Sequence, residues 1–116
     1  MTNQKRLNME IKGITLTPDE IAVYLQENGL NVNDTYNATD KAQTRKIYET
    51  ALSILESIAN QPALMKNYSQ DDQTVSQFHE NLMARIDQLD NKINKLKREE
   101  DKAANQNGSF FMLFNQ

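Results

Sequence analysis

Apolar residues recur at helical spacing in three stretches of the chain, and polar segments separate these stretches. The first stretch begins at Thr17, which can cap a helix, with Pro18 at the first helical position and Glu20 placed to complete a capping box. The apolar residues that follow are Ile21, Tyr24 and Leu25. Gly29 can end the helix in a left-handed conformation. The pattern predicts one short helix between Thr17 and Gly29.

The second stretch has the broadest apolar face of the chain. Thr39-Asp40 can cap its start, and Pro62 restricts the backbone at its end. Spacings of three and four place its apolar residues on one stripe: Ile47, Tyr48, Ala51, Leu52, Ile54, Leu55, Ile58 and Ala59. The stripe predicts the core helix of the protein. In the connector before it, we expect Leu30, Val32 and Tyr36 to point inward.

The third stretch predicts the longest helix, from Val75 to about Ala104, which would span roughly 45 Å. Its apolar residues form a narrow heptad seam: Leu82, Ile86, Leu89, Ile93 and Leu96. This seam is longer than the two preceding helices are expected to cover. We therefore expect the part up to Ile86 to pack inside the chain. Leu89, Ile93 and Leu96 are expected to contact another subunit. The alternative is that the whole seam packs against the second helix of the same chain.

Residues 1–16 and 105–116 differ from the helical domain that we predict over residues 17–104. At the start, Leu7, Met9 and Ile11 alternate with polar residues, a pattern compatible with a short edge strand, but we expect an irregular arm. At the end, a polar linker precedes five consecutive large apolar residues: Phe110, Phe111, Met112, Leu113 and Phe114. Such a run rarely stays in water, so we expect it to dock on another subunit rather than on its own core. The predicted fold is all-α: a bundle of three main helices, the third projecting, with a flexible arm and tail.

Composition narrows the functional classes. The 116 residues carry a net charge of −3 and no cysteine, which excludes disulfides and thiolate metal sites. The acidic balance disfavours a nucleic-acid-binding domain, and no stretch has the length of a membrane span. The basic residues of the third helix are interleaved with acidic ones, a pattern typical of a solvated face or a partner helix.

No group of residues predicts catalysis. His79 is the single histidine and has no suitable partner at helical spacing. Asp71 and Asp72 are adjacent, but the segment lacks the spaced ligands and the glycine of a calcium loop. We therefore expect a protein that binds other protein chains, is not an enzyme and needs no metal or cofactor.

The order of these helices resembles a known family. The similarity covers about residues 16–93 and rests on Leu16-Thr17-Pro18-Asp19-Glu20-Ile21, the spacing from Leu25 to Tyr36, the helix over 46–60, Asn67-Tyr68-Ser69 and the last-helix residues Leu82, Ile86 and Ile93. In these features the chain resembles the head–tail connector, or neck adaptor, proteins of tailed bacteriophages and prophages. The long last helix and the apolar end depart from that pattern.

The resemblance implies a structural protein of the virion neck, assembled in the host cytoplasm. Copies would form a homo-oligomeric ring below the portal protein, contact tail components and extend a channel through which DNA passes without specific binding. In such a ring we expect acidic residues to face the channel: Asp71, Asp72, Glu99, Glu100 and Asp101. The alternatives are a non-viral coiled-coil adaptor or small regulatory protein that dimerises through the third helix, and a helix-turn-helix DNA-binding protein, which the charge disfavours.

Overall fold

The computed structural model describes residues 1–68 and 74–114, with the side chains of Asn67 and of residues 105–114 outside the description. Within these ranges the protein is all-α, as predicted, and contains no strand. The described part has five helices rather than the three main ones expected: α1 (Asn3–Glu10), α2 (Pro18–Glu27), α3 (Lys41–Ala59), α4 (Pro62–Tyr68) and α5 (Val75–Phe114). The molecule is elongated, with principal extents of 62 × 30 × 19 Å.

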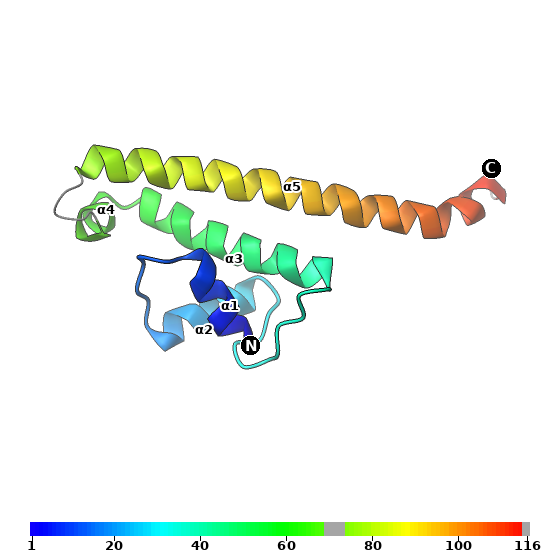
Figure 1. Cartoon of the computed structure of the whole chain (residues 1–116), viewed down its shortest axis with the longest axis horizontal. Helices are drawn as coiled ribbons and strands as arrows, with labels where there is room; N and C mark the ends of the chain where they lie inside the picture. Colours follow the sequence, from blue (N-terminus) through cyan, green and yellow to red (C-terminus); the bar gives the residue numbers. More distant parts are fainter. Residues whose placement is uncertain (69–73, 115–116) are drawn as a thin grey trace.

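Helix α3 is the centre of the fold (Figure 1). It lies between α5 on one side and α1 and α2 on the other, and it also contacts α4. Because α3 has several neighbours, it buries one broad face: Ile47, Thr50, Ala51, Ile54, Leu55 and Ile58. The Thr50 hydroxyl donates to the Lys46 carbonyl at 2.7 Å, so this buried polar group is satisfied. The prediction of α3 as the core helix is consistent with this burial.

The predicted helix boundaries are confirmed where capping chemistry defined them. Glu20 N donates to Thr17 Oγ1 at 3.2 Å and Thr17 N donates to Glu20 Oε1 at 3.0 Å, which completes the capping box of α2. The bond from the Thr17 N–H, and next the Thr17 side chain, favour the ionised carboxylate and lower the pKa of Glu20. The Asp40 carboxylate accepts from two backbone N–H groups at the start of α3. Gly29 has φ +80°, the left-handed conformation expected after α2.

The prediction of an irregular N-terminal arm is wrong. Residues 3–10 form α1, and Leu7 (0% exposed) and Ile11 (2%) belong to the hydrophobic core. The chain before α1 is held against the α2–α3 connector, where Tyr36 N donates to the Met1 carbonyl at 2.8 Å and Asn3 N to the Asp34 carbonyl at 2.9 Å. Leu7 and Ile11 are four residues apart and share one helix face, whereas Met9 points to solvent.

The prediction of a flexible linker before the apolar segment 110–114 is also wrong, because the backbone there is helical. Helix α5 is 40 residues long and continues through residues 105–109 to Phe114. At about 1.5 Å per residue it spans about 60 Å, which accounts for the long axis of the molecule. The segment contains no proline, and the one glycine, Gly108, weakens a helix by only about 1 kcal/mol.

Candidate protein-interaction surfaces

The apolar seam of α5 packs against α3 of the same chain. Leu89 (0% exposed) and Ile93 (3%) are buried, as is Leu82, and Leu96 is half-buried. The expectation that Leu89 and Ile93 contact another subunit is therefore wrong. The two helices are antiparallel, and the 19 residues of α3 reach about 28 Å. That length covers α5 from Leu82 to about Glu100, an 18-residue distance of about 27 Å.

Ion pairs fasten α5 to the first turns of α3. The Arg45 guanidinium binds both carboxylate oxygens of Glu100, with Nε to Oε2 at 2.6 Å and Nη2 to Oε1 at 3.3 Å, and its Nη1 donates to Glu49 at 2.6 Å. These hydrogen bonds, first to Glu100 and then to Glu49, raise the pKa of Arg45 above its ordinary value. Lys41 Nζ lies 3.2 Å from Glu99.

These contacts involve two of the acidic residues expected to face a channel. Glu99 and Glu100 pair with cations of α3, and their place relative to a channel stays a prediction. Asp101 is exposed and follows the last ion pair. Asp71 and Asp72 lie outside the described residues, and so do the side chains of Phe110, Phe111, Met112, Leu113 and Phe114.

We expect Arg45→Gln to lower the free energy of unfolding by about 1–2 kcal/mol, because it removes a two-point, partly buried charged contact between α3 and α5. Lys41→Gln is the matched control, since it removes a single pair in which the lysine side chain is 63% exposed. Its effect should stay within about 0.5 kcal/mol. Urea unfolding of both variants measures the difference, and equal values would mean that the Arg45 contact is no stronger than a surface pair.

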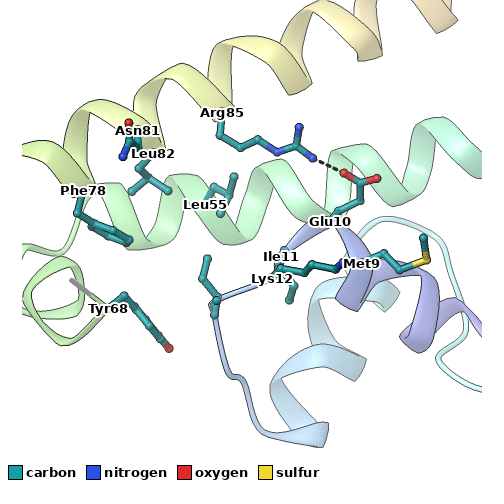
Figure 2. A pocket seen from close by; sticks show the side chains of 12 residues that line it. Met9, Glu10, Ile11, Lys12, Leu55, Tyr68, Phe78, Asn81, Leu82 and Arg85 are labelled. Atoms are coloured by element: carbon teal, nitrogen blue, oxygen red, sulfur yellow. Dashed lines mark hydrogen bonds and ion pairs between the residues drawn. The ribbon is translucent and has the colours of Figure 1, made fainter. Parts of the chain in front are cut away.

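A groove opens between the end of α1 and the first half of α5 (Figure 2). Its volume is about 440 Å³, and its apolar lining comes from the α1–α2 region, α3, α4 and α5: Ile11, Ile14, Leu55, Tyr68, Phe78 and Leu82. We call this feature the α1/α5 groove. The groove does not follow from the sequence when residues 1–16 are expected to form an irregular arm. The available signals were Thr2 as a helix cap, the Leu7/Ile11 spacing and an Arg6–Glu10 pair one turn apart.

Charged side chains lie beside the α1/α5 groove, and Lys12 is among the residues that line it. The Glu10 carboxylate pairs with Arg85 of α5 and, at 2.9 Å, with Arg6 of its own helix. Burial lowers the pKa of Arg6, but hydrogen bonds to Glu10 and Tyr36 outweigh it, so the net pKa is raised. The Arg6 guanidinium also lies 5.7 Å from the centre of the Tyr48 ring. These contacts join α1, α3 and α5. Because two guanidinium groups share one carboxylate and Lys12 also lines the groove, the side of the groove keeps a net positive charge.

The described side chains contain no cluster of three or more His, Cys, Asp or Glu residues that could hold a metal ion. His79 is exposed on the first turns of α5. In the described part of the chain, no helix is both long and apolar enough to cross a membrane. Comparisons with protein-family models, curated proteins and solved structures find no match for this chain.

Proposed function

We propose that this chain is a non-catalytic structural protein, a head–tail connector of a tailed bacteriophage or prophage. Its copies would form a ring in the virion neck, below the portal protein and next to tail components, around a channel that DNA crosses without specific binding. One observation carries the proposal: α5 continues beyond its last contacts with α3, and each described side chain after Glu100, from Asp101 to Ala104, is exposed.

The free end of α5 favours a protein partner. Fourteen residues separate Glu100 from Phe114, so about 21 Å of helix extends past the ion pairs with α3. Isolated helices of this length are only marginally stable in water, and most helices gain stability by packing an apolar face. This one ends in five large apolar residues. A second protein surface would supply the missing contacts, as expected for a subunit that joins other subunits.

The coiled-coil adaptor is the weaker candidate. Dimerisation through α5 needs an unpaired apolar seam, but Leu82, Leu89 and Ile93 are already buried in the chain's own core. The large apolar side chains that the described part of α5 exposes are Val75 and Met83, too few for a second seam. A helix-turn-helix DNA-binding role is disfavoured by the net charge of −3.

The proposal predicts that the chain is a stoichiometric component of tailed particles. Mass spectrometry of particles purified from cells that carry the gene should detect it at a constant ratio to the portal protein. Removing the gene should leave DNA-filled heads and separate tails in electron micrographs, because the joining component is missing. Joined, infectious particles without this chain would refute the connector function.

A further inference from the structure

We infer that the segment Phe110–Phe114 of one copy binds in the α1/α5 groove of a second copy and joins the two head to tail. The inference deepens the proposed function and rests on its self-assembly. Both components belong to this chain: an open apolar groove beside the first half of α5 and an apolar segment at the far end of the same helix.

The groove and the segment match in chemistry. Isoleucine, leucine and aromatic side chains line the groove, and its volume of about 440 Å³ lies within the range of about 300–1,000 Å³ found for apolar binding sites. The charged residues of its lining are Glu10, Lys12 and Arg85, and Glu10 pairs with Arg85. Residues 103–116 contain no charged side chain at all. An uncharged, apolar occupant is therefore the one that loses least on leaving water.

A copy cannot fill its own groove with this segment. Leu82 lines the groove, and Phe110 follows 28 residues later on the same helix, about 42 Å away. Figure 1 shows the first half of α5 and its C-terminal end at opposite ends of the molecule. The occupant must come from another copy for as long as α5 remains helical.

This geometry also determines the symmetry of the assembly. The contact uses two different surfaces of the chain, so each copy can bind one neighbour through its groove and another through its segment. Such head-to-tail contacts produce a closed ring when the rotation between copies closes, and an open filament when it does not. A ring is the arrangement that the connector function requires.

Cysteine cross-linking tests the contact directly, because the chain has no cysteine of its own. Met9→Cys places a thiol beside the groove at a side chain that is 51% exposed, and Met112→Cys places one in the middle of the segment. Oxidation of the full-length double variant should yield a ladder of disulfide-linked dimers, trimers and larger species on a non-reducing gel. Each single variant can give at most a dimer. Peptide mass spectrometry should find the bond between positions 9 and 112, which requires Cα atoms within about 7 Å.

Phe111→Asp in the double-cysteine background should reduce the ladder by about tenfold or more, because a carboxylate would have to enter the apolar groove. Asn105→Asp is the matched control: it adds the same charge outside the segment and should leave the ladder intact. An equal effect of the two substitutions would overturn the contact.

Light scattering of the wild-type protein separates the two proposals. Association without a link between positions 9 and 112 would overturn the docking contact and leave ring assembly standing. A monomer with no ladder at high concentration would overturn both. A link within one copy would show that the segment folds back, which contradicts the head-to-tail contact. A ladder from a chain that is absent from particles would support the contact and refute the connector function.

Discussion

Leu7→Ala is expected to lower the free energy of unfolding by about 3 kcal/mol, within the range of about 2–5 kcal/mol for leucines removed from a core. The Leu7 side chain is completely buried between α1 and the rest of the hydrophobic core. Single domains are stable by only about 5–15 kcal/mol, so this change removes a large part of the total. The melting temperature should fall by roughly 10–20 °C in a circular dichroism melt.

Met9→Ala is the control for this substitution. It shortens another apolar side chain two residues away in α1, but Met9 is exposed, so its effect should stay within about 0.5 kcal/mol. If both variants melted like the wild type, α1 would contribute nothing to the core, and residues 1–16 would behave as the irregular arm expected from the sequence.

Local signals were enough to predict α2 and α3. The capping box of Thr17 and Glu20, the Asp40 cap and the left-handed Gly29 each depend on residues within one or two turns of the chain. Such interactions are formed between near neighbours, and their chemistry can be recognised without knowing the rest of the fold. The apolar stripe of α3 predicted a core helix for the same reason.

Helix α1 could not be identified as readily because tertiary contacts stabilise it. Eight residues are too few for an isolated helix to be stable in water. It forms here because Leu7 and Ile11 pack on the core and because the residues around Asn3 bond to the α2–α3 connector. The alternation of Leu7, Met9 and Ile11 fits a strand as well as a helix, and burial rather than pattern decides between them.

The α1/α5 groove could not be predicted from the sequence either, because it also depends on tertiary contacts. It exists only where α1, α4 and α5 converge, and the Glu10–Arg85 pair beside it joins residues 75 positions apart.

The heptad seam of α5 could be recognised in the sequence, but the helix that covers it could not. A period of apolar residues indicates that a helix face is buried, and it does not indicate whether the covering helix belongs to the same chain.

Leu89→Asp tests whether α3 of the same chain covers the seam of α5, and it is expected to prevent folding of the isolated chain. The side chain is fully buried at the α3–α5 interface, and an unpaired carboxylate there costs several kcal/mol in addition to the lost apolar packing. The sum is comparable to the whole stability of a domain of this size. Circular dichroism should show a large loss of helix at 25 °C, whereas Gln88→Asp, the matched control at the exposed neighbouring position, should retain the wild-type spectrum.

Aspartate substitutions along the apolar seam of α5 should become less destabilising toward the end of its contact with α3. Ile93 is buried, so Ile93→Asp should lower the free energy of unfolding strongly. Leu96 is half-buried and water can reach a carboxylate there, so Leu96→Asp should lower it less. If instead all three variants kept a folded, wild-type-like monomer and lost only self-association, the seam would be an intersubunit surface. Leu89 is completely buried in the core of its own chain, so it has no surface left to contact a neighbouring subunit. This burial favours the first outcome, a loss of stability that decreases from Leu89 to Leu96.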